Sequence, residues 1–209
     1  MCERLKYENE AYASGKTCII GLDEAGRGPM AGPLVVGGVI FRPGYYREDI
    51  NDSKQLTEKK REELYDIIVR DALAYQIEII DVDDVDRLNV YQASKKGMLD
   101  AIEHIHIKPD YALTDAMPLG TAIEHQAIVK GDSLSISIAA ASILAKVTRD
   151  RIMKQYDLQY PEYGFAKNKG YPTKQHKEAL QLYGITPIHR KSFQPVQDVL
   201  NKQLSLDLF

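Results

Sequence analysis

The stretch Thr17–Ile40, TCIIGLDEAGRGPMAGPLVVGGVI, decides the fold of this 209-residue chain. It opens with an apolar run from Cys18 to Leu22, bounded by a cluster of glycines and prolines, which is typical of a buried β-strand. Two adjacent carboxylates, Asp23 and Glu24, follow where this strand should end. Like charges at the tip of a hydrophobic strand repel each other unless a cation lies between them. We therefore expect a metal site at the end of the first strand.

A glycine-rich segment follows the acidic pair. Gly26-Arg27-Gly28 leaves the backbone open to a ligand, because two of these residues lack a Cβ. A dinucleotide-binding loop would place a helix next, whereas Pro29 and a second apolar strand at 33–41 come next here. We therefore interpret the segment as a loop that faces a phosphate-bearing substrate.

The composition is that of an ordinary globular protein, with 44% hydrophobic and 27% charged residues. No apolar run approaches the ~18 residues that a membrane helix needs. The first sixteen residues are polar and include acids, unlike a secretory signal, and Cys2 and Cys18 form no CxxC pair. We therefore expect one domain, a monomer, located in the cytoplasm.

Charge is unevenly distributed along the chain. The net charge is −3, but residues 129–209 hold 12 Lys and Arg against 7 Asp and Glu. One interpretation is a solvated surface, which is the usual role of a charge bias of this size. The other is a basic C-terminal part that follows nucleic-acid phosphates while the acidic part holds metal.

The rest of the chain alternates between helical and strand patterns, which favours one α/β domain with a mixed sheet. Thr57 and Thr173 are expected to cap helices, and Gly184 to end one. The expected elements are helices at 3–12, 58–73, 89–105, 133–156 and 174–183, strands up to 23 and at 33–41, 74–80, 111–115 and 127–129, an acidic connection at 81–86, a loop at 161–172 and a loosely held tail from 187.

Two further acids stand where strand ends and helix starts are expected. Asp115 ends a strand, as Asp23 does, and Asp132 lies at the start of the long helix. With Glu24 they would offer the oxygen ligands that hard divalent cations prefer. Taken alone, Asp132 would be a helix N-cap and Asp115 a turn residue. Strand alternation also points Asp23 and Glu24 to opposite faces, so sharing a metal requires the strand to twist or break at Glu24.

Several strings together resemble one family, bacterial ribonuclease HII of the type 2 RNase H group. The resemblance covers about residues 21–193 and keeps the order of the motifs. The strings are GLDEAGRGP at 21–29, DSK at 52–54, TD at 114–115, KGD at 130–132, AAASILAKVTRD at 139–150 and NKGYP at 168–172.

This resemblance implies an α/β RNase H-like fold, with a central mixed five-stranded sheet flanked by helices and a C-terminal helical segment. It implies one catalytic domain at 1–193, followed by a tail at 194–209. It further implies an endonuclease that uses two Mg²⁺ or Mn²⁺ ions. Such enzymes cut RNA in RNA–DNA hybrids and nick duplex DNA 5′ of an embedded ribonucleotide, leaving 3′-hydroxyl and 5′-phosphate ends.

The resemblance also assigns roles to individual residues. The family's metal-binding and catalytic carboxylates correspond to Asp23, Glu24, Asp115 and Asp132. Its substrate-sensing tyrosine corresponds to Tyr171, which alone would be interpreted as a surface turn residue. The 2′-hydroxyl that such enzymes sense is both donor and acceptor, and tyrosine offers a flat apolar face with a polar tip.

The family's Gly-Arg-Gly loop corresponds to Gly26, Arg27 and Gly28. In the family this loop contacts the ribose 2′-hydroxyl and the adjoining phosphate through backbone groups. Backbone beside glycine reaches such a group without interference from a side chain.

Five cations are candidates for contacts with substrate phosphates, although each alone would more commonly be solvated. They are Lys54, Lys146, Arg149, Lys169 and Arg190.

The histidines suggest no catalytic base. We expect His104, His106 and His125 to be structural or exposed. His189 could approach the substrate, but nothing in its sequence context assigns it a catalytic role.

The last residues carry a separate pattern that is similar to the peptide with which bacterial proteins dock on the DNA-polymerase sliding clamp. In such peptides a Gln anchor precedes apolar side chains that enter a groove. The alternative is an amphipathic fragment that packs on its own domain. The residues concerned are Gln203, Leu204, Leu206, Leu208 and Phe209.

Two other functions fit parts of this pattern less well. A non-catalytic nucleic-acid-binding module would gain nothing from four acids near phosphates. A hybrid-only enzyme like ribonuclease HIII would normally carry an additional N-terminal domain, for which the sixteen residues before the first strand leave no room.

Overall fold

The computed structural model describes residues 3–206, and their side chains as far as residue 202. The chain divides into two compact units. Unit 1 comprises residues 1–25, 35–79 and 94–147, and unit 2 comprises residues 26–34, 80–93 and 148–209. The separate expectation of a catalytic domain at 1–193 with a tail at 194–209 stays a prediction.

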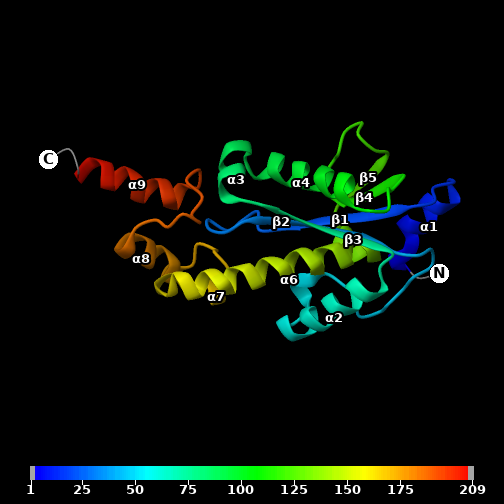
Figure 1. The fold of residues 1–209 in the computed structure, drawn as a ribbon, viewed down its shortest axis with the longest axis horizontal. Helices are drawn as coiled ribbons and strands as arrows, with labels where there is room; N and C mark the ends of the chain where they lie inside the picture. The colour runs from blue at the N-terminus through cyan, green and yellow to red at the C-terminus, as the bar shows by residue number, and fades with distance from the viewer. Residues whose placement is uncertain (1–2, 207–209) are drawn as a thin grey trace. The chain divides into compact units, whose positions relative to one another are not determined.

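Five strands form one mixed sheet, which belongs almost entirely to unit 1 (Figure 1). Their order is β3-β2-β1-β4-β5. Strand β1 pairs antiparallel with β2 and parallel with β4, and β4 pairs parallel with β5. This confirms the expected mixed five-stranded sheet. The strands are β1 (Ile19–Ala25), β2 (Leu34–Ile40), β3 (Ala74–Ile80), β4 (Tyr111–Asp115) and β5 (His125–Ile128).

Helices flank this sheet, as expected (Figure 1). Thr57 caps α2, because its Oγ1 accepts a hydrogen bond from the Lys60 N–H at 3.2 Å. No helix in the described part of the chain is both long and apolar enough to cross a membrane. The helical elements of unit 1 are η1 (Glu3–Leu5), α1 (Lys6–Ala13), η2 (Ser53–Gln55), α2 (Glu58–Asp71), most of α4 (Val90–His104), α5 (Gly131–Leu134) and the first half of α6 (Ile136–Gln159).

Glycines let α6 approach the sheet closely. A Cβ at Gly21 would stand 2.2 Å from the carbonyl carbon of Ser137, and one at Gly37 would stand 2.4 Å from the Ala141 oxygen. The next residue, Gly38, instead has the Ala101 side chain of α4 nearby. Neighbouring residues of β2 therefore face α6 and α4 respectively, as strand alternation requires. The core between α2, α6 and the sheet includes Val39, Leu64, Ile68, Ala140 and Leu144.

Unit 2 is helical apart from the loop 26–34 and short connections. Thr173 caps α8 through its Oγ1, which accepts from the His176 N–H at 3.3 Å, and Gly184 follows the helix with φ +80°, both as expected. Its apolar cluster includes Met30, Met153 and Phe165. Its elements are α3 (Val82–Leu88), the second half of α6, η3 (Pro161–Tyr163), α7 (Phe165–Asn168), α8 (Lys174–Tyr183) and α9 (Gln194–Leu206).

Two connections expected to be irregular contain helices. Residues 82–88 form α3, because the Asp81 carboxylate accepts a hydrogen bond from the Asp84 N–H at 2.8 Å and Val82 and Val85 are buried. Residues 161–172 contain η3 and α7, whose Tyr163 and Phe165 lie in the unit 2 core. In residues 82–88 the few apolar side chains that stabilise the helix stand among acids. In residues 161–172 they stand among glycines and lysines, so neither sequence pattern indicates a helix.

The prediction of a loosely held tail from residue 187 is wrong for most of its length. Residues 194–206 form α9, and its side chains Val196 and Val199 are buried in the unit 2 core. These two valines are three residues apart, so they lie on one helix face. Leu208 and Phe209 lie outside the described residues.

Candidate metal centre and substrate loop

Three carboxylates converge at one edge of the sheet in unit 1. Asp23, Asp115 and Asp132 each offer an oxygen atom, and these oxygens all lie within 4.8 Å of one another. The parallel pairing of Leu22 with Thr114 brings the ends of β1 and β4 together, which places the first two acids side by side. Asp132 lies in α5, and the N–H of the preceding residue, Gly131, donates to Asp115 Oδ1 at 2.8 Å.

Asp23 carries the largest electrostatic penalty of the three. Its side chain is buried, at 3% exposure. Burial raises its pKa well above the ordinary value, and the charges of Glu24 and Asp115 raise it further. Hydrogen bonds from Ser142 and from the Glu24 N–H oppose this rise. A carboxylate held in this position is stabilised in its charged form by a cation, which the three acids are placed to bind.

The other two acids are held by donors that favour their charged forms. Burial, with the charge of Asp132, raises the pKa of Asp115 above its ordinary value, although the Gly131 N–H and Lys54 oppose this rise. Lys54 Nζ donates to Asp132 Oδ2 at 3.1 Å. Burial opposes the charge on Lys54, but this hydrogen bond and the charges of Asp132 and Asp23 raise its pKa overall. Lys54, predicted to contact phosphate, therefore lies at the carboxylates in this structure.

Glu24 is the predicted ligand that the structure does not bring into this group of three. It is the next residue of β1 after Asp23, pairing with Val36 where Asp23 pairs with Gly37, so strand alternation directs the two side chains to opposite faces. Its charge still acts on Asp23, whose pKa it raises. Asp132, in contrast, is not the N-cap of its helix, because Lys130 holds that position in a left-handed conformation.

Sequence reasoning assigned no role to two buried serines beneath this centre. Ser142 of α6 hydrogen-bonds Asp23, and the Ser142 and Ser53 hydroxyls lie 2.8 Å apart. The chain Ser53–Ser142–Asp23 thus ties η2 and α6 to the end of β1. Both serines occur in the strings that carry the family resemblance, but a serine in a helix or turn gives no sign of its partner.

In unit 2, the glycine-rich loop at 26–34 is held on both sides by backbone. The Met30 N–H donates to the Gly170 oxygen at 2.9 Å, and the Gly32 N–H donates to the Ile188 oxygen at 2.8 Å. A Cβ at Gly28 would lie 3.2 Å from Cε1 of Tyr171. The structure therefore brings Gly28 and the ring of Tyr171 together, and Tyr171 is 47% exposed.

Arg149 and Arg190 hold this loop from inside. Both are buried, at 1% and 0% exposure. Arg149 donates to the carbonyls of Ala31, Pro33 and Lys169 at 2.9–3.0 Å. Arg190 donates twice to one further carbonyl of the loop, at 2.8 and 3.0 Å. The prediction that these guanidiniums contact phosphate is therefore corrected, because their donors serve the loop backbone.

Other predicted cations and histidines occupy varied positions. Lys169 Nζ is buried without a hydrogen-bond partner in the described part of the chain, and Lys146 is half-buried on α6. His104 contacts Glu78 at 2.8 Å, and His125 accepts from the Leu119 N–H, so neither faces the centre as a base. His106 is exposed. The side chains of Gln203, Leu204 and Leu206, like Leu208 and Phe209, lie outside the described residues.

Comparison with known proteins identifies relatives of this chain. The family model described as Ribonuclease HII matches residues 20–196. The chain is similar to ribonuclease HII of Acholeplasma laidlawii, with 52% identity covering 96% of this chain and 98% of the relative. Among solved structures it resembles ribonuclease H2 from Pyrococcus horikoshii, with 26% identity and a TM-score of 0.77 over 88% of this chain and 98% of that one.

A second solved structure, the PCNA:RNase HII complex from Archaeoglobus fulgidus, matches with 27% identity and a TM-score of 0.71, over 91% of this chain and 100% of that one. The mixed sheet, the three converging acids and the matches to known proteins together define an RNase H-type endonuclease. This class of enzyme acts on RNA–DNA hybrids and depends on metal. Within that class, the chain belongs to the ribonuclease HII family.

Proposed function

We propose that this enzyme nicks duplex DNA on the 5′ side of an embedded ribonucleotide, and cuts the RNA strand of hybrids, with Mg²⁺ or Mn²⁺ as the metal. The convergence of Asp23, Asp115 and Asp132 within 4.8 Å is the observation that carries this proposal. Their oxygens fit a hard divalent cation, and their mutual repulsion disfavours the metal-free charged state. We propose Glu24, whose charge raises the pKa of the neighbouring Asp23, as the fourth metal-binding acid.

Metal ions held by these acids would supply an activated water and stabilise the leaving oxygen of the phosphodiester. The residues of this chain do the rest. Asp23, Asp115 and Asp132 hold the cations, and the hydroxyl of Ser142 keeps the Asp23 carboxylate in place. Lys54 pairs with Asp132, and its largely exposed side chain would also be available to a substrate phosphate.

Recognition of the ribonucleotide is proposed for Tyr171 and the loop residues Gly26, Arg27 and Gly28. The exposed ring of Tyr171 against Gly28 supports this role, because an apolar face and open backbone groups stand together. A 2′-hydroxyl placed there can both donate and accept a hydrogen bond. Lys146 is proposed to contact phosphates, and Lys169 to do so only after its buried Nζ moves to the surface, whereas Arg149 and Arg190 act through the loop.

We also propose that the C-terminal residues Gln203, Leu204, Leu206, Leu208 and Phe209 dock on a sliding clamp, and that the enzyme is a cytoplasmic monomer. The solved complex of PCNA with the RNase HII of Archaeoglobus fulgidus supports the proposal of clamp binding. Deletion of residues 203–209 should abolish retention on immobilised bacterial clamp while leaving nicking unchanged. Retention that survives the deletion would remove this peptide from the proposal.

The test of the activity uses a DNA duplex with one ribonucleotide, with Mg²⁺, Mn²⁺ or EDTA, for the unmodified enzyme and Asp23→Asn. Metal-dependent nicking 5′ of the ribonucleotide, lost in the variant, is expected. Cutting of a plain hybrid without nicking of this duplex would indicate a hybrid-only enzyme like ribonuclease HIII. Binding without cutting of either substrate would indicate the non-catalytic binding module.

A further inference from the structure

Two buried histidines of unit 2 form a hydrogen-bonded chain that ends on the backbone of Tyr171. His176 of α8 and His189 are 0% and 1% exposed. Their Nε2 atoms lie 3.0 Å apart, His176 Nδ1 lies 2.9 Å from the Tyr171 carbonyl oxygen, and His189 Nδ1 lies 3.0 Å from the backbone nitrogen of Thr186. Neither ring reaches solvent, and the chemistry above gives neither a role.

The end groups of this chain determine where every proton lies. The Thr186 N–H can only donate, so His189 Nδ1 must accept and its proton sits on Nε2. The Tyr171 carbonyl can only accept, so His176 must carry its proton on Nδ1. The remaining pair then matches, with His189 Nε2–H donating to His176 Nε2. Both rings are neutral in this arrangement, since a second proton on either would oppose another donor.

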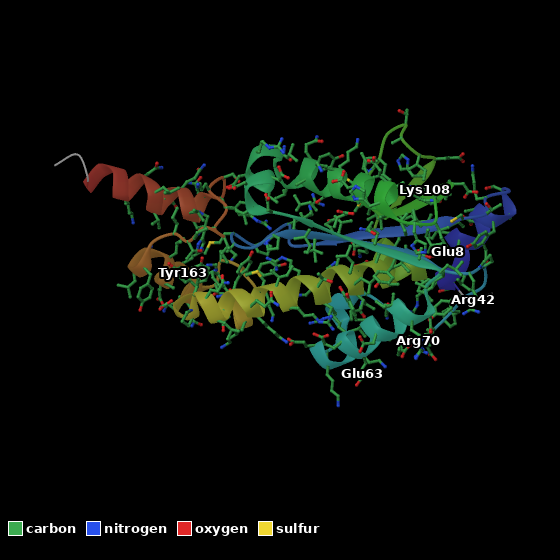
Figure 2. The ribbon with its side chains drawn as sticks, viewed as in Figure 1. Glu8, Arg42, Glu63, Arg70, Lys108 and Tyr163 are labelled. Atoms are coloured by element: carbon green, nitrogen blue, oxygen red, sulfur yellow. The ribbon has the colours of Figure 1, made fainter. Side chains whose placement is uncertain are left out.

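The surroundings agree with two neutral rings. Tyr163 (labelled in Figure 2) and Phe165 pack on both imidazoles, with ring centroids 5.2–6.2 Å apart. Burial lowers the pKa of His176, and it lowers that of His189 to about 4 with help from His176. The hydroxyl of Tyr163 is engaged separately, by donating to the Gly184 carbonyl at 2.8 Å.

The same chain reaches the glycine-rich loop at its other end. His189 forms a bridge with Ala31, and the Arg190 N–H donates to the Met30 oxygen at 2.9 Å. The loop is thus fastened to residues 188–190, and the His189 ring continues through His176 to Tyr171. The glycine-rich loop, which carries Gly28, is therefore connected to Tyr171 through the two imidazole rings.

We propose that His176 and His189 are positioning residues that hold Tyr171 against Gly28, so that a ribonucleotide is recognised there. This inference rests on the proposed function of Tyr171 and the loop. It differs from a general packing role in one respect: the histidines act through Tyr171, and their removal matters only while Tyr171 is present.

A matched pair of variants separates the two ends of His176. In His176→Asn the amide nitrogen stands where Nδ1 was and can still donate to the Tyr171 carbonyl. In His176→Gln the amide reaches the position of Nε2 and can still meet His189, but the link to Tyr171 is lost. We expect kcat/KM for nicking at a single ribonucleotide to fall about threefold to tenfold in the Gln variant, the effect of one hydrogen bond, and less in the Asn variant. His106→Phe, at an exposed position, is the control.

The decisive measurement is a double-mutant cycle with Tyr171→Ala, a change at a 47% exposed side chain that the fold should tolerate. In the Tyr171→Ala background, His176→Gln should produce no further loss of kcat/KM. Equal losses in both backgrounds, or no loss in the unmodified background, would overturn the inference while leaving the proposed function intact. If Tyr171→Ala itself changes nothing, the proposed role of Tyr171 fails, and the inference fails with it. Thermal melting of each variant identifies any that do not fold; His189→Asn, which keeps an acceptor for Thr186 but not the link to His176, then takes the place of His176→Gln.

Discussion

Lys54 donates a hydrogen bond from Nζ to Oδ2 of Asp132 at 3.1 Å, so a largely exposed cation neutralises a buried carboxylate of the metal centre. Three acids whose oxygens lie within 4.8 Å of one another repel each other in their charged forms. The Lys54 ammonium partly substitutes for the positive charge that a metal ion would supply to the three acids. This relationship leads directly to the first prediction.

Lys54→Met should lower the melting temperature of the metal-free protein by at most about 2–4 °C, because an exposed ion pair is worth no more than ~1 kcal/mol. Saturating Mg²⁺ should remove most of the difference, since the metal then supplies the positive charge. Differential scanning fluorimetry with EDTA and with Mg²⁺ measures both effects. Lys54→Arg keeps the charge and is the control; a loss of the same size in Lys54→Arg would show that the charge is not responsible.

Asp23→Asn should have the opposite effect on the metal-free protein. The change removes one of the mutually repelling charges, while its side-chain oxygen can still accept from the Glu24 N–H. We expect a melting temperature in EDTA higher by about 2–4 °C, corresponding to about 1 kcal/mol, and a smaller shift on adding Mg²⁺. The same fluorimetry checks it. A lower melting temperature in EDTA would mean that the carboxylate of Asp23 stabilises the fold even without metal.

Much of this site could be predicted because its acids follow apolar runs or precede a helical pattern. Asp23 and Asp115 follow short apolar runs that are typical of strands, and the parallel pairing of these strands brings the two acids side by side. The capping threonines Thr57 and Thr173 were predictable for the same reason, since their partners lie within four residues. Strand ends and helix caps can be predicted because both are determined by residues that are near in the sequence.

What could not be predicted depends on distant partners. A sequence does not distinguish a solvated arginine from Arg149, which is buried because loop carbonyls more than 100 residues away accept its hydrogen bonds. The pairing of His176 with His189, and of Ser53 with Ser142, arises from tertiary packing in the same way. The helix α9 could not be predicted because few apolar residues, Val196 and Val199 among them, mark its buried face among polar ones.

The histidine pair predicts a pH dependence of stability. The folded pKa of His189, about 4, lies below the ordinary value of ~6.5 expected in the unfolded chain. Between these values the unfolded state binds more protons, so this contribution is present in full above pH ~6.5 and is lost as pH falls toward 4. Urea unfolding in EDTA from pH 4.5 to 7.5 measures it, with an upper limit of about 3 kcal/mol. His189→Asn should give a flatter profile in this window, and equal slopes for the two proteins would contradict the assignment.

The last prediction concerns Gly170, which fastens the glycine-rich loop beside Tyr171. Its φ is +83°, and an added Cβ would stand 2.2 Å from the Ala31 carbonyl oxygen, which belongs to the backbone of the loop. Gly44 has a similar φ of +76° but nothing within 4 Å of an added Cβ. Gly44→Ala should therefore cost only the ~1–2 kcal/mol of the left-handed conformation. Gly170→Ala should cost more and should also lower kcat/KM for a single-ribonucleotide duplex, because the clash displaces the loop. Urea unfolding and steady-state nicking of the two variants make the comparison; equal stability losses, with nicking unchanged in both, would show that the loop does not depend on this close contact.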